Sequence, residues 1–291
     1  MEQNLPLDIP PNEGVSILTL TKILESAGIG DTYTCRYEAE ILVSHFCGVR
    51  PAEIPLCRRV VYTSPALMDA VRRRIARYPL QYIVGEWQFC NETYLVSPDC
   101  LIPRADTEIL VEAAAELLPQ GGRFIDLCTG SGCIAVSLLA LRKDATGDAV
   151  DLYPNTLRVA EQNAERNGVK PRFTAHLADV LHPEFMQSLG KFDLILSNPP
   201  YIPSRVVDGL APEVGFEPRA ALDGGDDGLI FYRALLSLYP QYLARNGRMI
   251  LEIGYDQADA LRALAEEYRL SCEIRRDLGG CDRVAILSPQ R

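Results

Sequence analysis

The stretch RFIDLCTGSGCIAVSLLAL, residues 123–141, decides the fold. Residues 123–128 form an apolar run typical of a buried strand, and residues 133–141 have the composition of a helix. The turn between them, 129–132, contains two glycines, which tolerate positive φ and let a ligand approach the backbone where a Cβ would clash. The following helix starts with free backbone N–H groups that suit a carboxylate or phosphate. The stretch therefore predicts a strand, a ligand-binding turn and a helix.

The same alternation of strand and helix continues from residue 103 to the end of the chain. Because the central strands are apolar throughout, this pattern predicts a three-layer α/β domain with a mainly parallel sheet. Further strands are expected at residues 149–152, 172–178, 192–197, 248–254, 272–276 and 283–288, and a further helix at 156–167.

The first part of the chain has a different pattern, which predicts short helices over residues 15–84. Apolar residues recur there at helical spacing in three stripes, and the arginines near the last stripe lie mostly off it. The stripes are Val15, Leu18, Ile23 and Leu24; Ala39, Leu42, Val43 and Phe46; and Leu67, Ala70, Val71, Ile75 and Tyr78, and the arginines are Arg72, Arg73, Arg74 and Arg77.

The remaining segments set the expected domain boundaries. Residues 86–101 combine aromatic and β-branched residues around a Cys-Asn-Glu turn, which predicts a β-hairpin. Residues 1–14 contain three prolines and predict a loose arm. We therefore expect an N-terminal helical domain over 1–84, a β-hairpin linker over 85–102 and an α/β domain over 103–291.

The composition of the 291-residue chain is that of an ordinary globular protein, with 47% hydrophobic residues, 23% charged residues and a mean hydropathy of −0.01. It excludes disordered and collagen-like classes, and no apolar run approaches the ~18 residues of a membrane-spanning helix. The nine cysteines form no Cys-x-x-Cys pair and there are only three histidines, so we expect reduced thiols and no metal site. Because the N-terminal residues lack a secretory pattern, the expected location is the cytoplasm.

The net charge of −10 is unevenly distributed. Residues 1–84 contain nine basic and nine acidic residues, so the whole excess of acid lies beyond them. An acidic α/β domain argues against broad nucleic-acid binding, which relies on Lys and Arg at phosphates. Residues 50–84 carry seven arginines against two acids, which indicates either a basic face for a macromolecular partner or a solvated helix face.

Two acidic residues follow the next strands at useful positions. Asp151 closes the second strand, nineteen residues after Gly132, where a carboxylate can accept hydrogen bonds from ribose hydroxyls. Asp179 closes the third strand and could accept from an adenine amino group, with Val180 beside the ring. These positions predict an adenosine-type cofactor. Residues 130–135 also fit the Gly-x-Gly-x-x-Ala dinucleotide fingerprint, so a nicotinamide-dependent oxidoreductase remains an alternative at this point.

The tetrapeptide Asn198-Pro199-Pro200-Tyr201 follows the strand at 192–197 and faces the same crevice as the glycine turn. The prolines remove two backbone donors and leave carbonyl acceptors, the asparagine adds a side-chain oxygen, and the tyrosine adds an aromatic face. Such a group fits a planar NH2. Its acceptors can draw a delocalised nitrogen toward a tetrahedral, more nucleophilic shape, so that methyl transfer from a sulfonium needs positioning and no histidine base.

These motifs resemble a known family. Residues 126–132 look like motif I of class I S-adenosylmethionine-dependent methyltransferases, and residues 198–201 look like the motif of those that methylate planar nitrogens. Residues 79–86 (PLQYIVGE), 101–108 (LIPRADTE) and 216–222 (FEPRAAL) are similar to blocks of the peptide chain release factor N(5)-glutamine methyltransferases, and the resemblance extends over residues 35–288.

The resemblance implies a small helical substrate-binding domain, a hairpin linker and a seven-stranded Rossmann-like methyltransferase domain. It implies transfer of a methyl group from S-adenosyl-L-methionine to the glutamine side-chain nitrogen in the Gly-Gly-Gln motif of release factors. Independently of the resemblance, we expect the protein to be a monomer. The implied substrate-binding and catalytic residues are Asn198, Pro199, Pro200 and Tyr201. The expected cofactor-binding residues are Cys128, Thr129, Gly130, Ser131, Gly132, Asp151, Asp179, Val180 and Asn198.

Three residues depart from the family pattern: Cys128 replaces a glycine, Val180 a larger and often aromatic residue, and Ala105 a proline. They bear on cofactor affinity more than on the type of reaction.

Four alternative functions remain open. A ribosomal-protein glutamine methyltransferase is close in motif. An adenine N6 DNA methyltransferase shares Asn-Pro-Pro-Tyr, but the chain shows no basic target-reading domain. A nicotinamide-dependent oxidoreductase gives that tetrapeptide no role. Cys128 favours a non-catalytic binding module, against which the intact tetrapeptide argues.

Overall fold

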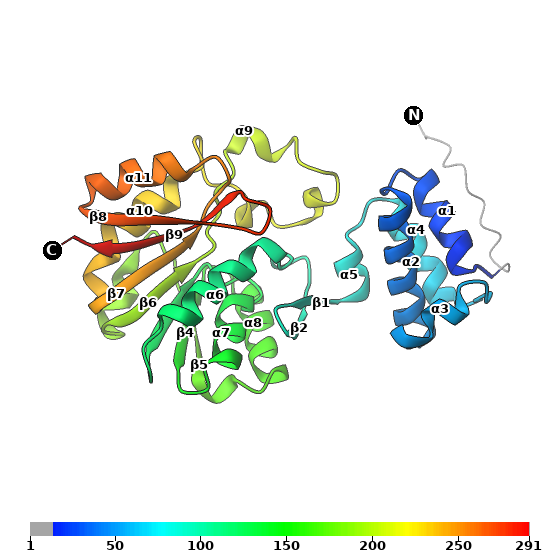
Figure 1. The fold of residues 1–291 in the computed structure, drawn as a ribbon, viewed down its shortest axis with the longest axis horizontal. Coiled ribbons are helices and arrows are strands. Elements are labelled where there is room, and N and C mark those ends of the chain that lie inside the picture. The colour runs from blue at the N-terminus through cyan, green and yellow to red at the C-terminus, as the bar shows by residue number, and fades with distance from the viewer. Residues whose placement is uncertain (1–13, 291) are drawn as a thin grey trace. The chain divides into compact units, whose positions relative to one another are not determined.

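The computed structural model describes residues 14–290, in two compact units (Figure 1). Unit 1 contains the described chain up to Gly85 together with Pro212–Phe216, and unit 2 contains Glu86–Ala211 and the described chain from Glu217 onward. The predicted loose arm lies outside the described residues except for Gly14. The units are described separately below.

Unit 1 is built of helices whose ends follow local capping rules. The helices are α1 (Ile17–Ser26), α2 (Thr32–Cys47), α3 (Ile54–Cys57), α4 (Pro65–Ile75) and α5 (Leu80–Val84), with a short 3-10 turn at Pro51–Glu53. The side chains of Ser16, Asp31 and Ser64 accept backbone N–H groups at the starts of α1, α2 and α4. Glycines with positive φ, Gly48 and Gly85, end α2 and α5.

Most of the predicted apolar stripes form the core of unit 1, with two corrections. Leu18 is exposed, because α1 begins at Ile17 and its buried face runs through Leu20 and Leu24 instead. Helix α4 ends at Ile75, so Tyr78 lies beyond the helix whose stripe was expected to include it.

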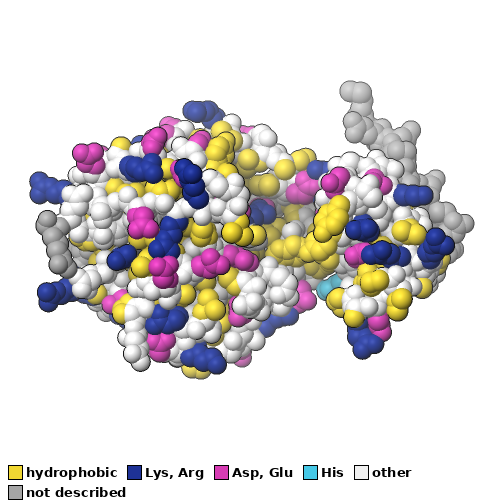
Figure 2. Space-filling view, viewed as in Figure 1, with side chains coloured by type: hydrophobic (Ala, Val, Ile, Leu, Met, Phe, Trp, Pro, Cys, Tyr) yellow, Lys and Arg dark blue, Asp and Glu magenta, His cyan; other side chains and the backbone are white. Residues whose placement is uncertain are grey.

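Arg74 corrects the expectation that the arginines of α4 lie on its outer face. Its guanidinium is buried, with Nε 2.6 Å from Oε2 of Glu38 and Nη1 2.9 Å from Oε1 of Glu213. Arg72 and Arg73 are exposed. On the face of unit 1 drawn in Figure 2, Lys and Arg side chains are scattered among apolar ones and form no continuous patch.

Unit 2 begins with the predicted hairpin and continues into a seven-stranded sheet. The hairpin pairs β1 (Glu86–Phe89) with β2 (Glu92–Leu95). The sheet has the order β5-β4-β3-β6-β7-β9-β8, in which only β9 runs antiparallel to its neighbours. Its strands are β3 (Arg123–Leu127), β4 (Thr146–Asp151), β5 (Phe173–Leu177), β6 (Phe192–Ser197), β7 (Leu243–Glu252), β8 (Leu270–Arg276) and β9 (Asp282–Pro289).

Helices cover both faces of this sheet, which confirms the three-layer α/β class (Figure 1). On one face α6 (Glu108–Leu117), α7 (Cys133–Leu141) and α8 (Pro154–Arg166) pack on the strands, and α10 (Ile230–Leu238) and α11 (Ala258–Glu267) pack on the other. Short segments complete the unit: α9 (Ser204–Val207) and 3-10 turns at Ala105–Thr107, Lys170–Arg172, Pro183–Ser188, Arg219–Ala221 and Pro240–Tyr242.

The strand order reverses between β3 and β6. From β3 the chain proceeds outward through β4 and β5 on one side, and β6 and β7 continue on the other. Ligands of open α/β sheets bind at such a switch point, outside the carboxyl ends of the strands. The glycine turn follows β3 and Asn198 follows β6, so both emerge at this point.

Candidate active site

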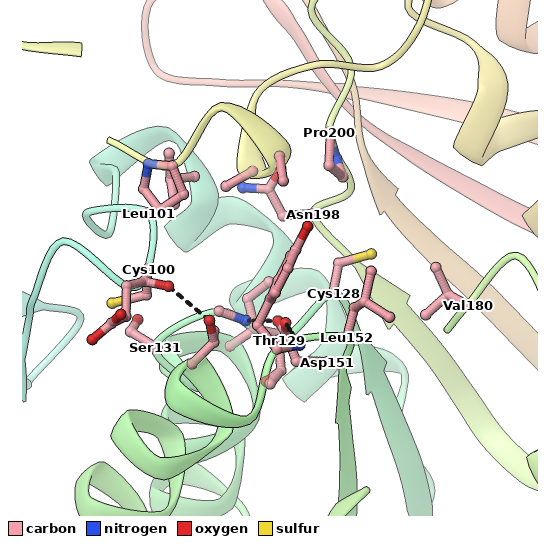
Figure 3. Close-up of a pocket in the computed structure, with 18 of the residues that line it drawn as sticks. Cys100, Leu101, Cys128, Thr129, Ser131, Asp151, Leu152, Val180, Asn198 and Pro200 are labelled. Carbon is pink, nitrogen blue, oxygen red and sulfur yellow. Dashed lines mark hydrogen bonds between the residues drawn. The ribbon is translucent and has the colours of Figure 1, made fainter. Parts of the chain in front are cut away.

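A cavity of about 290 Å³ lies in unit 2 at the carboxyl ends of β3, β4 and β6 (Figure 3). It is lined by most of the predicted site residues: Cys128, Thr129, Gly130, Ser131, Asp151, Asp179, Val180, Asn198 and Pro200. Gly132, Pro199 and Tyr201 were also predicted and do not line it. The structure thus brings the glycine turn, the two acids and the Asn-Pro-Pro turn to one cavity.

The glycine turn is held by its own hydrogen bonds. The backbone N–H of Thr129 donates to the Val150 carbonyl at 2.9 Å, and its hydroxyl donates to Oδ2 of Asp126 at 2.6 Å. Gly132, with φ +79°, acts by packing, because a Cβ there would lie 3.0 Å from Cβ of Ala160 on α8. Gly132 therefore allows the close approach of α8 and contributes no lining surface.

Cys128 adopts the backbone conformation of the glycine that it replaces. Its φ is +60°, in the left-handed region where a Cβ is unfavourable. Burial, together with nearby carboxylates led by Asp151, raises the pKa of its thiol well above the ordinary range. The side chain is therefore a neutral thiol in the cavity wall.

Asp151 connects β4 to the glycine turn. Its Oδ2 accepts the N–H of Gly130 at 3.0 Å and its Oδ1 accepts the N–H of Tyr153 at 3.1 Å. Burial raises the pKa of Asp151, and these backbone hydrogen bonds oppose the rise. A carboxylate oxygen has two acceptor positions, so each oxygen keeps one for a ligand hydroxyl.

Two buried polar atoms beside the turn have no partner among the described residues: Oδ1 of Asp126 and Oγ of Ser131. Asp126 is fully buried, and burial raises its pKa to about 7. Ser131 lines the cavity, although its hydroxyl oxygen is itself buried.

Asn198 reaches the cavity from the end of β6, which the Ser197 hydroxyl joins to β3 by a 2.7 Å hydrogen bond to the Leu127 carbonyl. Nδ2 of Asn198 lies 3.2 Å from the hydroxyl oxygen of Thr107 and donates to it. The amide oxygen is the end left for the cavity that Asn198 lines, across from Thr129 and Asp151 (Figure 3).

Tyr201 lies away from the cavity wall. Its hydroxyl donates to Oε1 of Glu252 at 3.2 Å, and its ring packs against the core between the sheet and α10. Its backbone carbonyl accepts from Gln257 at 2.9 Å. The tetrapeptide thus presents Asn198 and Pro200 to the cavity, while Tyr201 anchors the turn to the end of β7.

Several site residues were not singled out from the sequence. Glu252, at the end of β7, is 2% exposed, and burial raises its pKa to about 7 against the opposing effects of the Thr107 hydroxyl and Arg283. Arg104 lines the cavity and pairs with the buried carboxylate of Glu217, which also accepts the N–H of Ile102 at 3.0 Å. These residues come from distant segments, and their local sequence carries no signal of the pairing.

The comparisons agree with this geometry. The family model described as methyltransferase small domain matches residues 104–212, and the model described as PrmC N-terminal domain matches residues 19–85. A methyltransferase structure from Pyrococcus furiosus shares the fold, with a TM-score of 0.50 and 18% identity over 67% of this chain and 86% of that chain. The family model and the curated relatives show that the chain is a methyltransferase.

Two curated relatives narrow the class. The release factor glutamine methyltransferase of Geobacter sulfurreducens is 40% identical over 81% of this chain and 78% of its own length. That of Rhodospirillum rubrum is 41% identical over 86% of this chain and 78% of its own length. The chain belongs to the release factor glutamine methyltransferase family, which confirms the resemblance identified from the sequence and removes the oxidoreductase alternative.

Within residues 14–290, no helix is long and apolar enough to cross a membrane.

Proposed function

We propose that this protein transfers a methyl group from S-adenosyl-L-methionine to the side-chain amide nitrogen of the glutamine in the Gly-Gly-Gln motif of peptide chain release factors. The observation that carries the proposal is the shared cavity: Asn198 and Pro200 line the same cavity as the glycine turn and Asp151. Family membership supports the choice of release factors over other glutamine-containing substrates.

The residues present fit the cofactor. Asp151 has free acceptor positions for ribose hydroxyls, and the unpartnered Ser131 hydroxyl and the turn around Gly130 offer further contacts. Asp179 and Val180 form the part of the lining expected for the adenine ring. When bound, S-adenosylmethionine supplies an electrophilic methyl group on a positively charged sulfur.

The chain's own residues position and activate the substrate nitrogen. The amide oxygen of Asn198 accepts one N–H of the substrate glutamine, and a backbone carbonyl of Pro199 or Pro200 accepts the other. Holding both hydrogens returns electron density to the nitrogen and makes it nucleophilic toward the electrophilic methyl group that bound S-adenosylmethionine would supply. The methylated nitrogen then loses its extra proton, a step that needs no histidine.

The remaining expectations form part of the same proposal. Residues 1–84 form the domain that binds the protein substrate, and residues 103–291 form the domain that catalyses methyl transfer. Residues 85–102 link these two domains. The protein acts as a monomer in the cytoplasm, on a protein partner and without direct contact to nucleic acid or membrane. The exposed members of the basic face considered for that partner are Arg50, Arg59, Arg72 and Arg73.

Methyl transfer assayed in parallel on three acceptors tests the proposal. Radiolabelled S-adenosylmethionine is supplied with release factor, with ribosomal proteins and with DNA, and a release factor with its Gly-Gly-Gln glutamine changed to alanine is the matched control. We expect one methyl group on the release factor and none on the control. Label on a ribosomal protein alone would transfer the assignment to that substrate. No transfer to release factor at cofactor concentrations that saturate the protein would refute the proposal.

A further inference from the structure

The two ends of the Asn198 amide play different parts in the proposed reaction. Only the oxygen can accept an N–H of the substrate glutamine, whereas the NH2 end would oppose the substrate NH2 with a second donor. The side chain must therefore be held in one of two orientations related by a 180° rotation. In the structure its Nδ2 donates to Oγ1 of Thr107 at 3.2 Å.

Thr107 can hold this orientation only if its own proton points elsewhere. A hydroxyl has one proton. If Thr107 donated that proton to Asn198, the amide oxygen would turn toward Thr107 and away from the substrate. Thr107 lines the cavity but is only 2% exposed, so the groups buried beside it decide the direction of its proton. A nearby group that is only an acceptor is required.

Glu252 is that group. Burial raises the pKa of the Glu252 carboxyl group, and the nearby Thr107 hydroxyl lowers it. Its Oε1 accepts from the Tyr201 hydroxyl at 3.2 Å, and its buried Oε2 has no hydrogen-bond partner among residues 14–290. An ionised carboxylate donates nothing, so a Thr107 hydroxyl that turns toward the unpartnered Oε2 gives its proton to that oxygen and leaves its lone pairs to Asn198.

We propose that Thr107 is a positioning residue for methyl transfer: its hydroxyl, oriented by Glu252, holds the Asn198 amide with the oxygen toward the substrate nitrogen. This inference rests on the proposed function. It gives a role to two buried residues: Thr107, which immediately precedes α6 and lines the cavity, and Glu252, which ends β7 and does not line it.

Thr107→Val tests the inference, because valine keeps the shape of threonine and removes the hydroxyl. At pH 8.5, where Glu252 is charged, we expect kcat to fall about 10-fold or more while KM for release factor and Kd for S-adenosylmethionine stay within about 2-fold. Thr107→Ser, which restores the hydroxyl, should recover kcat to within about 3-fold. Ser137→Ala is the control, since it removes another buried hydroxyl, hydrogen-bonded to Tyr94 at 2.5 Å outside the cavity lining, and should leave kcat unchanged.

A double-mutant cycle tests the role of Glu252. Glu252→Gln turns a carboxylate that can only accept into an amide whose NH2 can also donate to the Thr107 hydroxyl, so kcat should fall by itself and fall no further when Thr107→Val is already present. Additive losses would show that Glu252 does not act through Thr107 and would overturn that part of the inference. Thr107→Ala provides the second variant if the valine side chain prevents folding.

The outcomes separate this inference from the function on which it rests. If wild type methylates release factor and Thr107→Val does so with unchanged kcat, the positioning role is wrong and the function stands. The positioning role is also wrong if Thr107→Val weakens cofactor binding in proportion to kcat, since that indicates a distorted cavity. If wild type itself transfers no methyl group, the function fails first.

Discussion

Oδ2 of Asp151 accepts the backbone N–H of Gly130 at 3.0 Å, so the acid that closes β4 is joined to the glycine turn that follows β3. This contact helps to hold the carboxylate at the cavity wall, together with the N–H of Tyr153, and contributes to the shape of the turn. A residue in this position is expected to control cofactor affinity through both effects.

Asp151→Ala should therefore weaken cofactor binding about 10- to 100-fold, the range expected for loss of hydrogen bonds to a charged group. Calorimetric titration with S-adenosylmethionine measures the change. Asp148→Asn is the matched control on the same strand, because Asp148 pairs with Arg123 and His176 and does not line the cavity. The control should lower stability and leave cofactor Kd unchanged. Equal effects of the two variants on Kd would contradict the role of Asp151.

Asn198→Ala removes the acceptor proposed for the substrate N–H. We expect kcat to fall about 100-fold or more, because the lost interaction acts on the nitrogen as it becomes nucleophilic. Cofactor Kd should change little, since Asp151 and the glycine turn remain in place. Steady-state methyl transfer to release factor together with cofactor titration provides the comparison. Near-normal turnover would remove Asn198 from its proposed role.

Cys128→Val tests the strain in the glycine turn. A β-branched residue is strongly disfavoured at φ +60°, so this variant should lose about 1–2 kcal/mol of stability and bind cofactor more weakly. Cys272→Val is the control, because Cys272 is also half-buried and lies in β8, where valine is favoured. Urea unfolding of both variants measures the difference. Equal losses would show that the backbone at residue 128 does not limit the side chain.

Glu252 makes stability depend on pH. Its carboxyl group is buried against Tyr201 and Thr107, with Arg283 and Asp106 nearby, and its pKa rises from 4.5 to about 7. The folded protein therefore holds this proton more tightly than the unfolded chain, and its stability falls as pH rises from about 4.5 to 7.

The glutamine of Glu252→Gln is uncharged at every pH, so the variant does not lose stability by burying a charged carboxylate as the pH rises. Relative to wild type, the variant should gain up to about 3 kcal/mol in free energy of unfolding between pH 5 and pH 8. Urea unfolding at the two pH values gives the difference directly. A difference between variant and wild type that is the same at both pH values would show that the wild-type group does not titrate in this range.

Arg74 should matter for the stability of unit 1 far more than its neighbour Arg72. Arg74→Ala leaves the carboxylates of Glu38 and Glu213 without their shared partner, at a cost of about 3–5 kcal/mol. Arg72→Ala changes an exposed side chain and should cost no more than about 0.5 kcal/mol. Thermal unfolding of both variants measures this contrast, and similar losses would contradict the assigned burial of Arg74.

Local sequence was sufficient where an element is bounded by strong signals. Helix α7 and strand β6 have the boundaries expected from sequence, because the glycine turn precedes one and Asn-Pro-Pro follows the other. Asp151 ends its strand as expected, whereas Asp179 lies two residues beyond the end of β5. Other strands begin earlier than expected, because polar residues precede their apolar runs. Strand β4 begins at Thr146 and β7 at Leu243, whereas starts at residues 149 and 248 were expected.

The sequence by itself determined the order of strands and helices, the family and the glycine turn, acids and Asn-Pro-Pro turn of the cavity wall, because spacing, turn residues and motifs act over a few neighbouring positions. Only the tertiary structure decided which polar side chains meet. Arg74 is buried because Glu38 and Glu213 approach it, and Tyr201 turns from the cavity because Glu252 accepts its hydroxyl. The same holds for Thr107 and Asn198, which lie 91 residues apart in the chain and 3.2 Å apart in the site. Such contacts join distant segments, and no local pattern records them.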